Sequence, residues 1–237
     1  MSAWAPENTM EAFRKVLETS AAGVELDVHL SADGMPVICH DETIDRTSDG
    51  HGLLADMTYR QLLQYDFSQV EGKVFPEAGV CRIPLLPEVL ELFEPTGLRV
   101  NIELKTDKNP YPGIEAVVAA VIREAKMEQR VVVSSFNASS LSRFSAVAPK
   151  ITTGFLFVRP PRGLKRGIEE RRWDAVHPRY VYAGGALVRD AHARGMAVRA
   201  YTVDDPKRAV RLAAKGVDAV FSNNPVAIVD ALAQAGE

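Results

Sequence analysis

The stretch GVELDVHLSADGMPVICHD, residues 23–41, contains a strand-like apolar run that carries two acidic side chains. Glu25 and Asp27 are two residues apart, and side chains at positions i and i+2 of a strand point to the same face. Carboxylates are costly inside a core unless something binds them. A second short apolar run, residues 36–39, leads directly into His40. The stretch therefore predicts a strand whose acidic face serves a binding site.

Outward from this stretch, short apolar runs alternate with amphipathic helical segments along the chain. Strands that alternate with helices of this length are typical of βα units with parallel strands. The right-handed crossover rule then leaves a closed barrel or an open doubly wound sheet. Seven main strands are predicted, at residues 24–28, 100–104, 131–136, 152–157, 174–178, 197–203 and 218–223.

The strand count favours the barrel. The first predicted helix, which ends before Gly23, has no strand ahead of it, as expected for a (β/α)8 TIM barrel without its first strand. No GxGxxG or GxxxxGKS motif supports a nucleotide-binding open sheet. We therefore predict an α/β barrel forming one domain over residues 1–237, with irregular residues 41–82 as a small insertion. Capping-box spacing of Asn8 and Glu11 predicts that Asn8 caps the first helix.

Composition narrows the classes of partner. The net charge is −3 over 237 residues, which gives no electrostatic footprint for nucleic acid. No apolar run approaches the roughly 18 residues that a membrane span needs, and no signal peptide is visible. The two cysteines have no CxxC spacing, which indicates a reducing compartment and no zinc site. We expect a cytoplasmic protein; nothing in the sequence predicts its oligomeric state.

A second acidic strand completes the predicted site. Asn101, Glu103 and Lys105 repeat the i, i+2 spacing on the next main strand. In a parallel barrel the catalytic residues lie at the carboxyl ends of the strands. Three carboxylates at neighbouring strand ends suit Mg²⁺ or Ca²⁺, and Lys105 suits a phosphate oxygen. His40 supplies a group that titrates near neutral pH.

Each of these residues also has a structural interpretation. Glu103 and Lys105 alone can form a structural ion pair, and an isolated histidine such as His40 is more often a satisfied core residue. The other four histidines are less promising as catalysts. His29 is expected at the surface because the SADG turn that follows it carries it out of the site, and His177 either lines the rim or has a structural role. The remaining two, His51 and His192, are expected in a loop and on a helix surface.

Five motifs in order make the sequence resemble a known family. They are APENTMEAF (5–13), GVELDVHLSADGMPVICHDETIDRTSDGHG (23–52), IELK (102–105), AYTVDD (200–205) and KGVDAVFSNNP (215–225). The chain resembles the glycerophosphodiester phosphodiesterases, TIM barrels related to the phosphatidylinositol phospholipase C fold, over essentially its whole length. The resemblance implies metal-dependent hydrolysis of a small glycerophosphodiester to glycerol 3-phosphate and an alcohol, within lipid and glycerol metabolism.

Site residues follow from the matched motifs. The resemblance implies that Glu25, Asp27 and Glu103 are metal ligands, that His40 is one of two catalytic histidines, and that Lys105 lies near the phosphate. The insertion at residues 41–82 would shape the glycerol end of the site. The metal remains open between Mg²⁺, Ca²⁺ and Mn²⁺, and the alcohol head group is not predicted.

The sequence departs from the family pattern at its start. The family begins with a strand ending in His-Arg-Gly, and the residues ahead of APENT here are only MSAW. The expectation is that Met1 is an internal methionine with the first strand encoded upstream; the alternative is a truncated product with impaired chemistry. Tyr201 replaces a frequent tryptophan. Two rival functions stay open, namely a related phospholipase C- or D-type phosphodiesterase and a non-catalytic protein that binds phosphodiesters.

Overall fold

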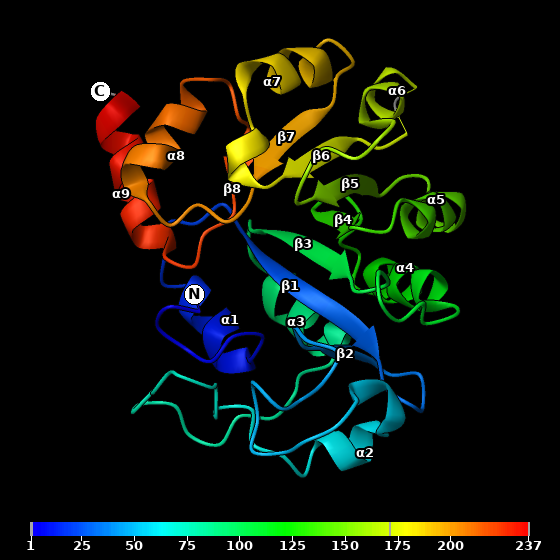
Figure 1. Ribbon diagram of the computed structural model, residues 1–237. Coiled ribbons are helices and arrows are strands. Elements are labelled where there is room, and N and C mark those ends of the chain that lie inside the picture. The colour runs from blue at the N-terminus through cyan, green and yellow to red at the C-terminus, as the bar shows by residue number, and fades with distance from the viewer. Residues whose placement is uncertain (1, 171, 237) are drawn as a thin grey trace.

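A computed structural model describes residues 2–170 and 172–236 of the chain, so Met1, whose role was predicted above, lies outside the described residues. Its centre is a curled, mostly parallel sheet with the strand order β2-β1-β3-β4-β5-β6-β7-β8 (Figure 1). The parallel strands are β1 (Gly23–Leu30), β3 (Arg99–Leu104), β4 (Val131–Ser135), β5 (Thr152–Phe157), β6 (Ala175–Pro178), β7 (Ala197–Ala200) and β8 (Ala219–Val220). The seven predicted strands and the α/β barrel class are confirmed.

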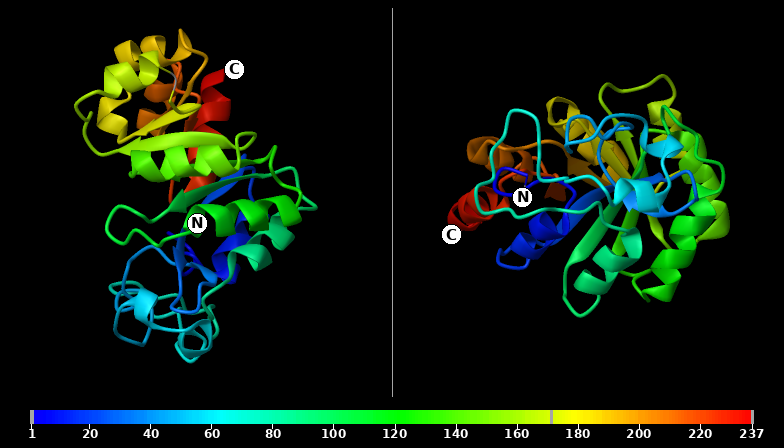
Figure 2. Two further views of the ribbon diagram at one scale, coloured as in Figure 1. Left: turned by 90° about the vertical axis from the view of Figure 1, so that its right-hand side faces the viewer. Right: turned by 90° about the horizontal axis from the view of Figure 1, so that it is seen from below.

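Helices cover the outer face of the curled sheet (Figure 2). Leu26 and Val28 of β1 and Ile102 of β3 point outward and pack against the helical layer in a continuous core. The alternate residues of the same strands therefore point to the interior of the curl. The helices are α1 (Met10–Val16), α2 (Tyr59–Leu62), α3 (Leu86–Phe93), α4 (Ile114–Glu124), α5 (Ala138–Val147), α6 (Leu164–Glu169), α7 (Gly185–His192), α8 (Pro206–Ala213) and α9 (Pro225–Gly236).

The barrel is open between β1 and β8. Within the described residues these two strands do not pair with each other. The short strand β2 (Pro36–Ile38) runs antiparallel to β1 and covers only its carboxyl end, at residues 28–30. A cavity of about 840 Å³ runs from the mouth of the curl into this opening, where Phe13 of α1 and Ile228 of α9 line it. The opening lies where the strand count predicted a missing first strand.

Residues 41–82 carry little regular structure. They contain a 3-10 turn (Leu54–Asp56) and the four-residue helix α2. Their apolar side chains form a small core of their own, in which Ile44, Leu54 and Leu62 are fully buried against Val37 of β2. This segment packs against Val37 of β2, and it begins directly after His40, which lines the cavity.

The first helix begins one residue later than predicted. Thr9, not Asn8, is the N-cap, and its Oγ1 accepts a hydrogen bond from the Ala12 backbone N–H at 3.3 Å. Asn8 has a left-handed backbone, φ 55°, and its side chain forms its hydrogen bonds with Asp27 of β1 instead of with the helix. Asn8 therefore misses the capping role because its amide serves another partner, Asp27, described below.

A close contact inside the curl predicts a stability effect. A Cβ on Gly154 of β5 would lie 2.5 Å from two ring atoms of the fully buried His177 on β6. We expect Gly154→Ala to destabilise the protein by about 1–3 kcal/mol, the usual cost of overpacking. Urea denaturation measures this, with Gly97→Ala as the control because no atom lies within 4 Å of a Cβ there. Equal stability of the two variants would contradict the close contact between Gly154 and the His177 ring.

Candidate active site

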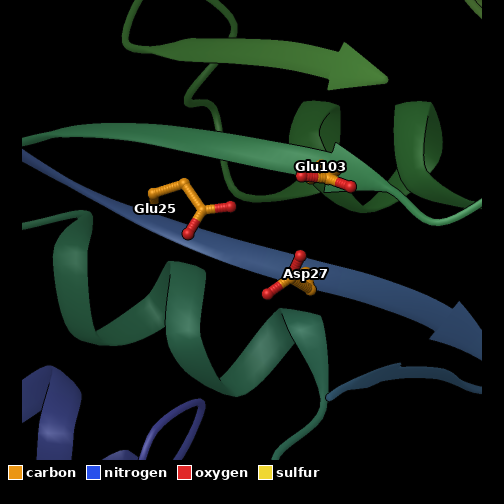
Figure 3. A group of neighbouring side chains, drawn as sticks. All are labelled: Glu25, Asp27 and Glu103. Carbon is orange, nitrogen blue, oxygen red and sulfur yellow. The ribbon is translucent and has the colours of Figure 1, made fainter. Parts of the chain in front are cut away.

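Two neighbouring strands bring the predicted carboxylates together. In the parallel pairing of β1 and β3, Asp27 lies opposite Glu103 and Glu25 lies opposite Asn101. All of these side chains belong to the inward-facing set of their strands. Oxygen atoms of Glu25, Asp27 and Glu103 lie within 4.8 Å of one another (Figure 3). The i, i+2 pattern on two adjacent strands therefore produces a single cluster.

Lys105 shares this face and lies among the carboxylates. Its Nζ lies 3.0 Å from Oε1 of Glu103 and 3.4 Å from Oδ1 of Asp27. Burial disfavours the charged amine, but the two carboxylates outweigh burial and raise the pKa of Lys105. Lys105 is thus a positively charged group within the cluster that pairs with two of the three carboxylates, Glu103 and Asp27, so ion pairing alone does not account for Glu25.

Burial and the excess of negative charge in the cluster raise the pKa values of two of its carboxyl groups. Burial and the neighbouring Asp27 raise the pKa of Glu103 to about 7. Burial and repulsion from Asp27 and Glu103 raise the pKa of Glu25 well above its usual value. The Glu25 side chain is exposed to water at the gap beside β1. Repulsion from the two neighbouring carboxylates therefore contributes more than burial to its raised pKa. One lysine does not balance three carboxylates.

The donor set fits a hard divalent cation. Oδ1 of Asn101 is buried and accepts no hydrogen bond among the described residues, whereas the buried Oε1 of Glu103 has the Lys105 ammonium 3.0 Å away. Buried acceptors without partners are rare in folded proteins and require an explanation. Carboxylate and amide oxygens are the ligands that Mg²⁺ and Ca²⁺ prefer. A cation held by Glu25, Asp27 and Glu103 would relieve the repulsion that raises their pKa values.

His40 follows β2 and lines the same cavity as the carboxylates. Its side chain is half exposed, and its Nδ1 lies 2.5 Å from Oδ1 of Asp41. Although burial opposes it, hydrogen bonds from Arg46 and His40 hold the pKa of Asp41 at about 2. An ionised Asp41 accepts a hydrogen bond from the Nδ1–H group of His40, which leaves Nε2 as the ring atom available for proton transfer. His40 therefore lines the candidate site and is not a buried core histidine.

Sequence reasoning missed four residues of the site, all in irregular segments. Asp41 and Arg46 support His40, with Arg46 Nε donating to Oδ2 of Asp41 at 2.6 Å. Glu7 accepts from Arg46, and Asn8 donates to Asp27. The only sequence signal for them was their presence in two of the five motifs. Turns have no periodicity from which side-chain direction can be predicted.

The expectation for His29 was wrong. The strand β1 continues through Leu30 and pairs with β2, so His29 is fully buried instead of exposed. Its Nδ1 lies 2.9 Å from the Tyr111 hydroxyl, and burial lowers its pKa to about 4. His177 is also fully buried, packed against Phe221, which favours its structural role. His51 and His192 lie on the surface as expected.

Aromatic and aliphatic side chains also line the cavity that contains His40. Phe136 follows β4 and Tyr201 follows β7, and their rings meet edge to face with centroids 6.0 Å apart. Leu156 of β5 lines the cavity between them. The Tyr201 hydroxyl is buried and has no hydrogen-bond partner among the described residues. The cavity thus joins a charged side on β1 and β3 to a largely apolar side on β4, β5 and β7.

Comparison with known proteins identifies this arrangement. A sequence model of the glycerophosphoryl diester phosphodiesterase family matches residues 1–227. The chain belongs to this family. A glycerophosphodiester phosphodiesterase of Caldanaerobacter subterraneus subsp. tengcongensis is 36% identical over 234 residues, covering 98% of this chain and 94% of that protein. One from Bacillus altitudinis is 37% identical over 226 residues, covering 93% and 90%.

Solved structures of glycerophosphodiester phosphodiesterases share the fold. A protein from Silicibacter pomeroyi, described as a glycerophosphoryl diester phosphodiesterase of inferred function, superposes with a TM-score of 0.90 at 26% identity, covering 99% of this chain and 91% of that one. A phosphodiesterase from Oleispira antarctica, solved with the product sn-glycerol-3-phosphate, has a TM-score of 0.85 at 32% identity, covering 98% and 93%. The predicted enzyme class and barrel fold are confirmed.

Proposed function

We propose that this chain hydrolyses small glycerophosphodiesters to sn-glycerol 3-phosphate and an alcohol, with one divalent cation, Mg²⁺ or Ca²⁺, held by Glu25, Asp27 and Glu103. The observation that carries the proposal is the convergence of three carboxylates, Lys105 and His40 on one cavity. The Oleispira relative, whose structure contains glycerol 3-phosphate, supports the substrate class. We place the activity in lipid and glycerol metabolism on the same ground.

Each side chain has a distinct task in this proposal. A cation held by Glu25, Asp27 and Glu103 would supply positive charge that neutralises the phosphate and lowers the pKa of a neighbouring hydroxyl or water. Lys105 holds a phosphate oxygen, for which it exchanges part of its present contact with Asp27 and Glu103. His40, aligned by Asp41, protonates the oxygen of the leaving alcohol through Nε2 as the phosphorus–oxygen bond breaks. The phosphate keeps its glycerol ester and gains an oxygen from water.

The proposed test measures which bond is broken. Glycerophosphocholine is incubated with the protein and Mg²⁺ or Ca²⁺, and ³¹P NMR follows the products. Glycerol 3-phosphate with choline supports the proposal. Phosphocholine with glycerol would instead show cleavage on the other side of phosphorus and favour the phospholipase C-type rival. Lysophosphatidylcholine serves as a comparison substrate, because preference for it would favour the phospholipase D-type rival.

A binding protein without catalysis is the second candidate. In the described part of the chain, His40 is the only histidine that lines the cavity, and the sheet is open beside Glu25. A general acid and a general base usually act together in such hydrolysis. Calorimetric binding of glycerophosphocholine without release of glycerol 3-phosphate would establish this alternative.

Metal removal is expected to abolish the reaction. EDTA should lower the rate by more than about 10²-fold, since a metal acting as Lewis acid contributes several kcal/mol. Adding back Mg²⁺ or Ca²⁺ in excess over EDTA should restore the rate, and parallel titrations with Mn²⁺ rank the ions. A rate that survives exhaustive chelation would contradict the assignment of the three carboxylates.

The expectations about cellular location, nucleic-acid binding and oligomeric state stay predictions. No helix among the described residues is both long and apolar enough to cross a membrane. The cytoplasmic location rests on composition, as does the absence of a nucleic-acid partner. Size-exclusion chromatography with light scattering would determine the oligomeric state.

A further inference from the structure

A single turn ahead of α1 contacts both halves of the site. Asn8 has a left-handed backbone, φ 55°, which is uncommon for residues other than glycine and which asparagine tolerates best. Its Nδ2 donates to Oδ2 of Asp27 at 2.9 Å, and its Oδ1 accepts from the Asp27 backbone N–H at 3.4 Å. The carboxylate that would bind the metal is thus held from outside the strand by one amide side chain.

The preceding residue reaches the other half of the site. Oε1 of Glu7 accepts a hydrogen bond from Nη2 of Arg46 at 2.6 Å. The same guanidinium holds both oxygens of Asp41, through Nε to Oδ2 at 2.6 Å and through Nη2 to Oδ1 at 3.2 Å. Asp41 in turn orients His40. Glu7 therefore lies at the start of a chain of charge-assisted bonds, which are stronger than neutral ones, and this chain ends on the imidazole.

The turn itself is anchored to the core. Thr9 is buried, and its hydroxyl donates to the Pro6 carbonyl at 2.7 Å while it caps α1. Phe13 and Val16 of α1 pack into the main core. Because residues 5–9 are anchored to a packed helix, the backbone positions from which the Glu7 and Asn8 side chains extend are fixed. Adjacent residues therefore fix two groups that lie on different elements, β1 and the loop after β2.

We propose that the Glu7–Asn8 turn is a positioning device that aligns the metal-binding carboxylate of Asp27 with the His40–Asp41 pair. The inference rests on the proposed function, and neither residue is assigned contact with substrate. Asn8 fixes which oxygen of Asp27 remains for a cation, because Oδ2 is engaged by Nδ2. Glu7 fixes the guanidinium that keeps Asp41 on the Nδ1 side of His40. The two positions therefore have separable effects.

Asn8→Gly tests the first half without adding backbone strain, since glycine adopts a left-handed φ freely. The variant should bind Ca²⁺ alone about 10–100-fold more weakly by calorimetry, the usual loss when a partner of a metal ligand is removed. The thermal midpoint with EDTA present reports any general loss of fold. Unchanged Ca²⁺ affinity would overturn the assignment of Asn8.

Glu7→Ala tests the second half. We expect kcat to fall about 10–100-fold while Ca²⁺ affinity and KM stay within twofold, and Glu7→Gln, which keeps an acceptor, should recover part of the loss. Glu11→Ala is the matched control, because Glu11 lies in the first turn of the same helix and makes no recorded contact with the site among the described residues. Loss of Ca²⁺ affinity in Glu7→Ala, or an equal loss of kcat in Glu11→Ala, would overturn the separation of roles.

An NMR measurement keeps the test independent of turnover. The proton between His40 Nδ1 and Asp41 should give a downfield ¹H signal that is absent from His40→Ala. The signal should be retained in Glu11→Ala and Asn8→Gly. It should be lost or shifted in Glu7→Ala. If the wild type binds no cation and hydrolyses no glycerophosphodiester, both the proposed function and the role of Asn8 are contradicted. The NMR signal still tests the role of Glu7, because it does not depend on turnover or on a bound cation. A signal unchanged by Glu7→Ala would overturn that assignment.

Discussion

Glu25→Gln is expected to lower the rate of glycerophosphodiester hydrolysis by more than about 10²-fold while leaving the metal-free protein at least as stable as the wild type. The loss should exceed the 10–100-fold that follows when only an outer partner of a ligand is removed. Glu25 forms no hydrogen bond or ion pair within the described residues, so the amide disrupts no existing contact. The amide has nearly the same size and shape as the carboxylate, and Glu25 lines the cavity at the gap beside β1, so the substitution adds no steric strain.

The expected stability gain follows from the sign of the pKa shifts. Burial and the acidic neighbours raise the pKa values of Glu25 and Glu103 above those of the unfolded chain, that of Glu103 to about 7. The folded metal-free state therefore binds more protons than the unfolded state between the unfolded pKa, about 4.3, and pH 7. Stability from this cluster falls as the pH rises through that window. Glu25→Gln removes one of the repelling charges and should make that fall smaller.

Two measurements separate this prediction from simple misfolding. Urea denaturation in EDTA at pH 5 and pH 8 should show a smaller loss of stability in Glu25→Gln than in the wild type, and calorimetry with Ca²⁺ should show weaker binding. Glu91→Gln, on the exposed face of α3, is the control and should change neither quantity. Lower stability of Glu25→Gln at both pH values would mean that Glu25 has a structural role, contrary to the metal assignment.

Periodicity explains which parts of the site were predictable. The period of two along a strand fixed the common face of Glu25 and Asp27, and the same rule placed Glu103 and Lys105. Parallel pairing then brought the two strands together, with Asp27 opposite Glu103. The counting of strands likewise predicted the open edge beside β1, because each apolar run is long enough to be recognised by itself.

The missed residues lie where no period applies. Asn8 and Glu7 are in a turn, and which of Asn8 and Thr9 caps α1 depends on the competing partner Asp27, 19 positions along the chain. Arg46 is in the irregular segment after β2, where the packing of a small local core sets the path of the backbone. The prediction that His29 is exposed was wrong because the residue at which a strand ends depends on the strand with which it pairs. Pairing with β2 extends β1 through His29 and Leu30, two residues beyond the predicted strand at 24–28.

His40→Ala is expected to reduce the rate about 10²–10⁴-fold, the usual contribution of a positioned acid or base. The side chain is half exposed and its removal buries no new polar group, so the fold should be retained. Because the space left is open to the cavity, added imidazole should restore part of the rate. His51→Ala, at a strongly exposed histidine 3.4 Å from Asp45, is the control and should leave the rate unchanged.

The choice of leaving group then assigns the direction of proton transfer. If His40 protonates the departing alcohol, its loss should matter much less for a glycerophosphodiester of p-nitrophenol, whose phenolate leaves without a proton, than for glycerophosphocholine. A rate ratio between wild type and His40→Ala that is equal for the two substrates would instead assign His40 as the base. Asp41→Asn should follow His40→Ala with a smaller loss, because Asp41 acts only through Nδ1 of His40. If His40→Ala hydrolyses both substrates as fast as the wild type, His40 takes no part in the chemistry, and another group must supply the proton.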